Sequence, residues 1–198
     1  APDPELQFTR AEHCADPARV DAIAGRVAAW VGLQDRDAPQ KRVALVLSTY
    51  PGKGWNMAHA VGLDALESAQ AILDDLGTPG PHALADALVQ DHLHWPLAEY
   101  LKALSTLPQS LRDDLHAAWG APQDDPACDG TGFAFAALRC GRTLVALQPE
   151  RGTRHLRDED YHDLSRTPRH AYVAFYLWLR AQADALVHIG AHGTLEWL

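Results

Sequence analysis

The feature that most constrains this fold is a short, continuously apolar segment around residue 45. Residues 42–48 (RVALVLS) place five aliphatic side chains in a row between Arg42 and Ser48. A strand that is buried on one face alternates apolar and polar residues, whereas an unbroken apolar run of this length is typical of a strand buried on both faces. Such strands occur in parallel sheets that helices cover on both sides. The segment therefore predicts an α/β domain.

The residues after this strand read as a loop and then a helix. Residues 49–56 (TYPGKGWN) are rich in glycine, and Asp64 with Glu67 three residues later resembles a capping box at the start of a helix. An apolar stripe at helical spacing follows, and Gly77 is a typical helix end. The stripe comprises Leu66, Ala69, Ile72, Leu73 and Leu76. Residues 43–77 thus form half of a βαβ unit.

The rest of the chain continues the alternation of helices and strands. Asp16-Pro17 begins a helix whose apolar residues recur at helical spacing up to Gly32. Further helices are expected at 83–90, after Pro96, after Pro108 and after Pro168. Strands are expected at 133–138 and 143–148, paired as a hairpin around Cys140-Gly141-Arg142, and a last, buried strand at 185–190. The predicted fold is a layered α/β domain with a mostly parallel sheet, helices on both faces and an added helical segment. We expect residues 1–41 to form an N-terminal helix and linker and residues 42–198 the α/β domain.

Composition excludes several classes of function. The formal net charge is −9 and no basic run is present, which argues against a nucleic-acid partner. The longest strongly apolar run, residues 171–179, is far shorter than the roughly 20 residues that a membrane span needs. The three cysteines are scattered and odd in number, and no signal peptide is recognisable, so a cytoplasmic location is expected. The chain starts without Met and stops at Trp197-Leu198, from which we expect a piece of a longer protein.

The predicted site lies in the loops that follow three strands. In open α/β sheets, ligands bind at the carboxyl ends of the strands. This rule selects residues 49–56, 148–155 and 190–197. The sequence has no G-x-x-x-x-G-K-[ST], GxGxxG or GxSxG motif, so neither a phosphate-binding loop nor a nucleophile elbow is expected.

The last of these loops carries a histidine and a glutamate. His192 lies between Gly190 and Gly193, which allow the backbone to turn tightly, and Glu196 follows. If a helix starts near Thr194, the Glu196 carboxylate returns close to the His192 imidazole. This pair suits a divalent metal ion or proton transfer. The alternative is that Glu196 is only a favourable charge at a helix N-terminus.

Several other residues are weaker candidates. His188 lies in the preceding strand and is either a further metal ligand or a histidine satisfied within the core. Lys53 contacts an anion or belongs to an ordinary loop, and Arg151 with Arg154 holds a carboxylate through paired hydrogen bonds or is solvated. His162, in the triplet Tyr-His-Asp, either contacts substrate or supports a residue that does.

Four stretches of this chain resemble a known family. DALVHIGAHGTLEWL, RVALVLSTYPGKGWNMAHAVGLD, TLVALQPERG and YHDLSRTPRHAYVAFYLWLR occur in the order found in the large subunit of cobaltochelatase and in its relative, the large porphyrin-binding subunit of magnesium chelatase. Together they span about residues 42–198. One departure is Arg169, where the family has a second proline before the histidine.

The resemblance implies an ATP-dependent chelatase. In this family the large subunit binds the tetrapyrrole hydrogenobyrinic acid a,c-diamide and Co²⁺, while separate AAA+ subunits bind ATP and Mg²⁺. The resemblance implies that His192 and Glu196 handle the metal or accept protons, with His188 as a third metal ligand. Tyr50, Lys53, Arg151 and His162 are then the expected tetrapyrrole-binding residues.

Two alternatives to cobalt insertion remain open at this point. One is the magnesium branch, which inserts Mg²⁺ into protoporphyrin IX; Trp197 after the glutamate favours the cobalt branch, because the magnesium branch tends to have phenylalanine there. The other is a non-catalytic module that binds a tetrapyrrole or docks the ATPase partners. The piece alone is not expected to be active.

Overall fold

The computed structural model describes residues 14–48, 59–60, 62–152 and 166–190. The chain divides into two compact units, Ala1–Arg36 and Asp37–Leu198. No helix among the described residues is both long enough and apolar enough to cross a bilayer.

The first unit contains the helix α1 (Pro17–Gln34). It begins as predicted, because the Asp16 carboxylate accepts hydrogen bonds from the backbone N–H groups of Ala18 and Arg19. It runs two residues beyond Gly32. The apolar stripe is present but none of its side chains is buried: Val20, Ile23, Val27, Trp30 and Val31 are 49–68% exposed. Helical spacing therefore predicted the helix correctly but not what its apolar face packs against.

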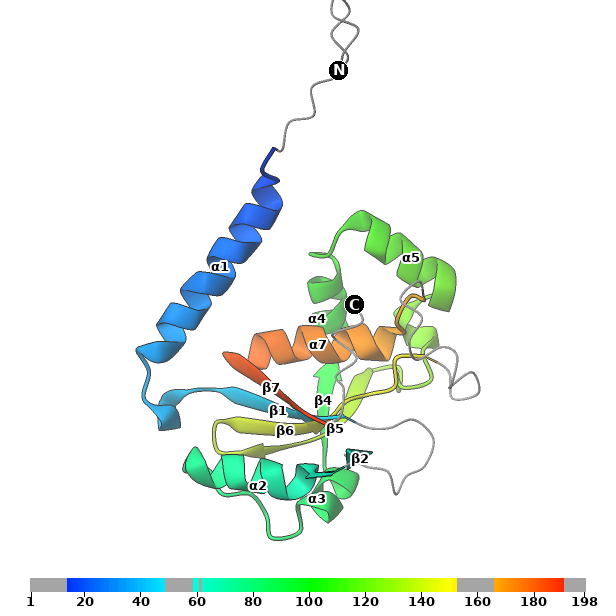
Figure 1. Cartoon of the computed structure of the whole chain (residues 1–198). Coiled ribbons are helices and arrows are strands. Elements are labelled where there is room, and N and C mark those ends of the chain that lie inside the picture. The colour runs from blue at the N-terminus through cyan, green and yellow to red at the C-terminus, as the bar shows by residue number, and fades with distance from the viewer. Residues whose placement is uncertain (1–13, 49–58, 61, 153–165, 191–198) are drawn as a thin grey trace, which may run out of the picture. The chain divides into compact units, whose positions relative to one another are not determined.

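The second unit is built on a five-stranded sheet with the strand order β4-β5-β6-β1-β7 (Figure 1). The strands are β1 (Val43–Leu47), β4 (His92–Pro96), β5 (Gly132–Cys140), β6 (Thr143–Leu147) and β7 (Ala185–Ile189). β1 pairs in parallel with β6 and β7, whereas β5 is antiparallel to both of its neighbours. Four of the five strands thus run in one direction, and the predicted α/β class with a mostly parallel sheet is confirmed.

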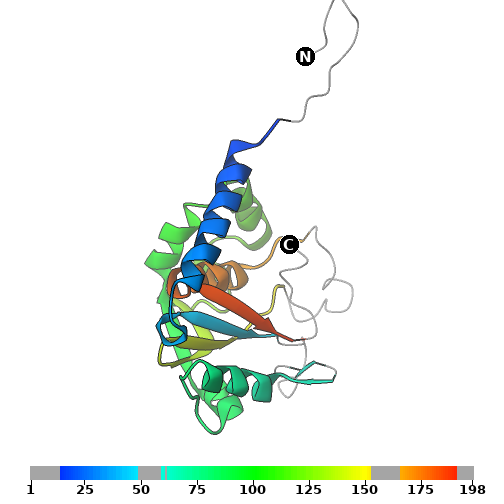
Figure 2. The same ribbon diagram turned by 60° about the vertical axis from the view of Figure 1, so that its left-hand side comes forward.

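Helices cover both faces of this sheet (Figures 1 and 2). On one face, α7 (His170–Gln182) and α4 (Leu97–Leu104) pack with the aromatic side chains of β4 and β5. On the other face, α2 (Ala65–Asp75) and α3 (Leu84–Gln90) pack with side chains of β1, β5 and β6. The added helical segment consists of α4 and α5 (Gln109–Trp119). Short elements complete the described chain: η1 (Ala38–Gln40), η2 (Pro122–Asp124), β2 (His59–Ala60) and β3 (Leu63–Asp64).

Local sequence signals explain most element boundaries. The Asp64 side chain caps α2 by accepting a hydrogen bond of 3.0 Å from the Glu67 N–H, as the capping-box pattern predicted. Gly77 follows α2 with φ +67°, a conformation that favours glycine. β5 and β6 form the predicted hairpin, whose two-residue turn contains Gly141 at φ +58°.

Two features of the sheet differ from the expectation. β4 was not predicted, because its five residues HLHWP end in a proline that reads as the start of the next helix. The last strand was expected to be buried, but in β7 only Ile189 is, while Leu186 and Val187 are 38% and 37% exposed. Among the described strands β7 pairs only with β1, and a strand with one neighbour keeps part of both faces accessible.

The ends of β1 and β7 touch at a glycine. A Cβ atom added to Gly190 would lie 2.5 Å from both Cβ and Oγ of Ser48, well inside van der Waals contact. Ser48 is itself buried, so it has little room to move away. Glycine is therefore required at position 190 by the close approach of the two strands.

A buried ion pair fixes the start of α7. The Arg169 guanidinium donates two hydrogen bonds to the Asp125 carboxylate, which also accepts one from the Ala171 N–H in the first turn of α7. Burial alone would raise the pKa of Asp125. The hydrogen bonds from Arg169, Ala127 and Ala171 and the charge of Arg169 outweigh that effect, so the pKa lies below its usual value.

Replacing Gly190 by alanine is expected to destabilise the fold by about 1–3 kcal/mol, because the added methyl group collides with Ser48. Urea denaturation of wild type and variant measures the loss. The cost should shrink in a Ser48→Gly background. Gly152→Ala is the matched control, since no atom of the described residues lies within 4 Å of a Cβ at that position. An equal cost with and without the Ser48 side chain would refute the steric explanation.

Replacing Asp125 by asparagine should lower the free energy of unfolding at pH 7 by about 2 kcal/mol, because charge-assisted hydrogen bonds to Arg169 are lost. Since the pKa of Asp125 is lower in the folded than in the unfolded chain, its contribution is full above the unfolded pKa of about 3.9 and disappears as the pH falls through the folded pKa. The difference in stability between wild type and variant should therefore narrow below about pH 4. Chemical denaturation over a pH series checks this.

Candidate functional site

The carboxyl ends of three parallel strands are joined by main-chain hydrogen bonds. The Gln148 N–H, just after β6, donates to the Leu47 carbonyl at 3.0 Å, and the Ser48 N–H, just after β1, donates to the Ile189 carbonyl at 3.0 Å. In Figure 2 the blue β1 and the red β7 point to the same edge of the sheet. The three strands after which the site loops are predicted therefore end side by side.

Most of the predicted site residues lie outside the described part of the chain. They are Tyr50, Lys53, His162, His192 and Glu196. Their assigned roles remain predictions. The structure does describe Arg151, which follows β6, and His188, which belongs to β7.

Arg151 presents hydrogen-bond donors that lack an acceptor in the described part of the chain. Its Nη2 donates to the Arg166 carbonyl at 3.0 Å, but its Nε and Nη1 are buried and find no hydrogen-bond partner among the described residues. The Arg151 carbonyl accepts a hydrogen bond of 2.9 Å from the Arg169 N–H, so the backbone at this position is held as well. A partly buried guanidinium whose Nε and Nη1 have no acceptor among the described residues suits a carboxylate ligand.

His188 points from β7 to the face of the sheet that α7 covers, because its register partner on β1 is Val46, a member of the core on that face. Its ring stacks on that of Tyr176, with centroids 6.1 Å apart and planes 17° apart. Burial lowers the pKa of the His188 imidazole, so the ring is neutral at pH 7. Its Nδ1 is buried without a hydrogen-bond partner among the described residues.

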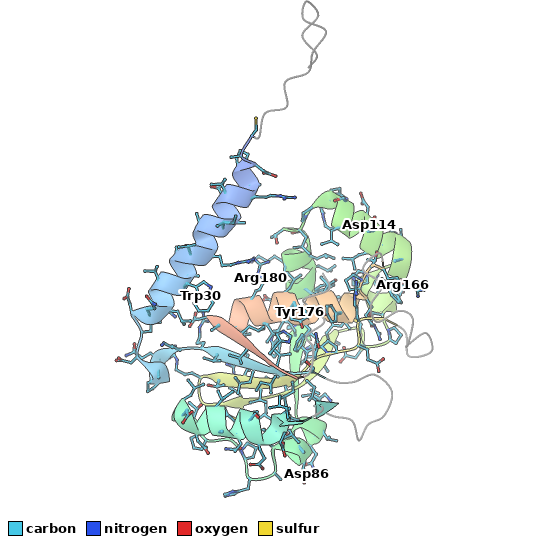
Figure 3. All side chains as sticks on the ribbon, viewed as in Figure 1. Trp30, Asp86, Asp114, Arg166, Tyr176 and Arg180 are labelled. Atoms are coloured by element: carbon cyan, nitrogen blue, oxygen red, sulfur yellow. The ribbon has the colours of Figure 1, made fainter. Side chains whose placement is uncertain are left out.

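A polar network beneath the strand ends was missed by sequence reasoning. The Gln148 amide donates to the hydroxyl groups of Tyr172 and Tyr176, and the Tyr176 hydroxyl lies 3.4 Å from His188 Nε2. Figure 3 labels Tyr176 on α7. A signal was available: Tyr172 and Tyr176 stand four residues apart on an apolar helix, so both hydroxyl groups lie on one face and need partners.

The described residues alone do not hold a metal ion. No group of three His, Cys, Asp or Glu side chains suited to a metal ion occurs within residues 14–48, 59–60, 62–152 and 166–190. What these residues offer at the strand ends is a cationic anchor for an anion, Arg151, and a neutral imidazole held in a hydrogen-bonded network, His188.

The comparisons with known proteins agree on one family. The CobN/Magnesium Chelatase family model matches residues 3–198. The aerobic cobaltochelatase subunit CobN of Pseudomonas aeruginosa is 36% identical over 94% of this chain, and that of a Sinorhizobium species is 31% identical over 91%. A magnesium-chelatase subunit of Chlorobaculum parvum is 30% identical over 91%.

A solved structure agrees with the sequence matches. The catalytic subunit of cobaltochelatase from Mycobacterium tuberculosis superposes on 93% of this chain with a TM-score of 0.77 at 33% sequence identity, and the match covers 18% of that chain. The chain likewise spans only 17% and 16% of the lengths of the two CobN relatives and 16% of the magnesium-chelatase relative. With a family model matched along almost its whole length, this chain belongs to the CobN/magnesium chelatase family.

Proposed function

We propose that this chain is the part of a cobaltochelatase large subunit at which Co²⁺ enters the tetrapyrrole hydrogenobyrinic acid a,c-diamide. The observation that supports the proposal is that the carboxyl ends of β1, β6 and β7, after which the three site loops are predicted, are joined by main-chain hydrogen bonds. The CobN relatives at 36% and 31% identity support the family reaction.

The chemistry of insertion defines what the site must do. When a divalent metal ion enters the ring, each N–H proton at the centre of the ring must leave as nitrogen–metal bonds form. In the proposal, the Glu196 carboxylate and the His192 imidazole accept these protons or deliver the metal. Arg151 holds a carboxylate of the tetrapyrrole, with Tyr50, Lys53 and His162 as further substrate contacts.

In this proposal, other subunits supply the energy for metal insertion. ATP and Mg²⁺ are bound by AAA+ subunits, in keeping with relatives that are named as subunits and with a sequence that has no phosphate-binding loop motif. The whole assembly acts in the cytoplasm. Activity belongs to the complete large subunit, of which this chain supplies about a sixth when measured against its relatives.

The magnesium branch is the second candidate, because the magnesium-chelatase relative is nearly as similar as the second CobN relative. Trp197 and the 36% identity to the Pseudomonas subunit favour cobalt. Titration of the complete subunit with hydrogenobyrinic acid a,c-diamide and with protoporphyrin IX separates the two branches. Tight binding of protoporphyrin IX alone would move the assignment to magnesium.

Glu196→Gln in the complete large subunit, assayed with its ATPase partners, should lower kcat for metal insertion by about 100-fold or more while tetrapyrrole binding is retained. The change removes a proton acceptor but keeps the size of the side chain. Absorbance of the metallated ring gives the rate, and fluorescence quenching gives the affinity. Glu99→Gln, on the exposed surface of α4, is the matched control. Unchanged insertion in Glu196→Gln would end the catalytic assignment.

Arg151→Gln should weaken tetrapyrrole binding about tenfold or more, because a charge-assisted hydrogen bond to a carboxylate is lost. A double-mutant cycle sharpens the test: amidating the substrate carboxylates should weaken binding to wild type but have little further effect on Arg151→Gln. Arg139→Gln, an exposed arginine paired with Gln182, is the control. Equal sensitivity of both proteins to amidation would rule out a contact between Arg151 and a carboxylate.

A further inference from the structure

The hydrogen-bonded network at the strand ends connects three elements through side chains. Gln148 Nε2 lies 2.6 Å from the Tyr176 hydroxyl oxygen and 3.1 Å from that of Tyr172, so the amide of the residue after β6 is bonded to two turns of α7. Tyr176 then reaches β7 through His188, at 3.4 Å from Nε2 and with stacked rings. A single chain of contacts thus runs from β6 through α7 to β7.

The network is fixed at its origin. Gln148 is only 4% exposed, and its N–H donates to the Leu47 carbonyl, so both the main chain and the side chain of this residue are held. Tyr172 is 1% exposed. A buried amide must use its donors, and here both N–H groups of the amide have hydroxyl acceptors. Gln148 is therefore a rigid point from which the positions of the two hydroxyl groups are set.

His188 is the point where the network meets the predicted metal site. It lies four residues before His192, and the ring is turned inward: Nε2 faces Tyr176, and Nδ1 is buried. Gly190, two residues later, has no side chain that could anchor the chain at this point, since any Cβ would collide with Ser48. Two side chains therefore hold the end of β7: Ile189 packs into the core on the α2 face, and His188 contacts Tyr176 on the α7 face.

We propose that Gln148 and Tyr176 are positioning residues for metal insertion, and that they act by holding His188 and, through it, the end of β7 from which the segment with His192 and Glu196 continues. This inference rests on the proposed function. It gives His188 the role of an anchor for that segment, in place of the role of metal ligand.

The kinetic consequence follows from where the network acts. Loss of the Tyr176 hydroxyl leaves the ring and its stacking on His188 in place but removes the polar link to Gln148. The reacting groups then lose their alignment in the transition state, whereas Arg151 still holds the tetrapyrrole. The defect should therefore appear in kcat and not in KM.

The test uses the complete large subunit with its ATPase partners. Tyr176→Phe should lower kcat for Co²⁺ insertion about tenfold, with KM for the tetrapyrrole within about twofold of wild type. Gln148→Met should have a similar effect, and the double variant should be no slower than the slower single variant, because both changes break one chain of contacts. Additive losses in the double variant would contradict a shared network.

The matched control is a second tyrosine–histidine pair, Tyr100 and His170. The Tyr100 hydroxyl lies 2.7 Å from His170 Nδ1, and Tyr100 is fully buried, so Tyr100→Phe removes a comparable hydrogen bond in the same core. It should reduce thermal stability about as much as Tyr176→Phe but leave kcat unchanged. A fall in kcat that is equal in Tyr100→Phe and Tyr176→Phe would mean general loosening of the fold and would overturn the positioning role.

Direct metal titration distinguishes whether His188 acts as an anchor or as a metal ligand. Co²⁺ affinity of the large subunit, measured by the visible absorbance of the bound ion, should change no more in His188→Gln than in Tyr176→Phe, which weakens the anchor but keeps the imidazole; a clearly larger loss of affinity in His188→Gln overturns the inference. The Glu196→Gln variant distinguishes a failure of the positioning role from a failure of the proposed function. If Glu196→Gln abolishes insertion while Tyr176→Phe inserts at the wild-type rate, the positioning role fails and the proposed function stands. If Glu196→Gln inserts normally, the proposed function itself fails.

Discussion

The parallel pairing of β1 with a strand on each side is the constraint on which the rest of this structure depends. All five residues of β1 are buried, so the strand exposes no polar face and must be covered by helices on both sides. Because β6 and β7 run in the same direction as β1, their carboxyl ends meet at one edge. An antiparallel neighbour would have sent one of the three site loops to the opposite end of the sheet.

The core divides at this central strand into two chemically different halves. On the α7 face it is aromatic, with Phe133, Phe135, Phe175 and Trp178 in mutual ring contact. On the α2 face it is aliphatic. Buried tyrosines fit only the first of these halves, because polar partners for their hydroxyl groups are present there. The hydrogen-bonded network of Gln148 accordingly lies on the α7 side, next to the strand ends.

Local signals allowed much of this fold to be predicted. The unbroken run at Val43–Leu47, the cap at Asp64 and the tight turn at Gly141 each depend on near neighbours in the chain, and each is found where expected. β4 and the exposure of β7 depend on which strands become neighbours, which no short pattern specifies. The hydrogen-bonded network could not be predicted for the same reason. Tyr176 is 28 residues from Gln148 and 12 residues from His188 in the sequence, and the three side chains meet only because α7 packs against the sheet. Of the predicted site, the structure describes Arg151 and His188.

The ion pair between Asp125 and Arg169 has a consequence for how this family varies. Proline is the residue that the resemblance expects at position 169, and proline supplies neither the guanidinium that neutralises Asp125 nor the N–H that bonds to the Arg151 carbonyl. A buried carboxylate without its cation destabilises the fold. A chain that gains one of these two residues before the other is therefore less stable. The two positions should therefore change together during divergence, with an acidic residue at 125 accompanying arginine at 169 and a neutral residue accompanying proline.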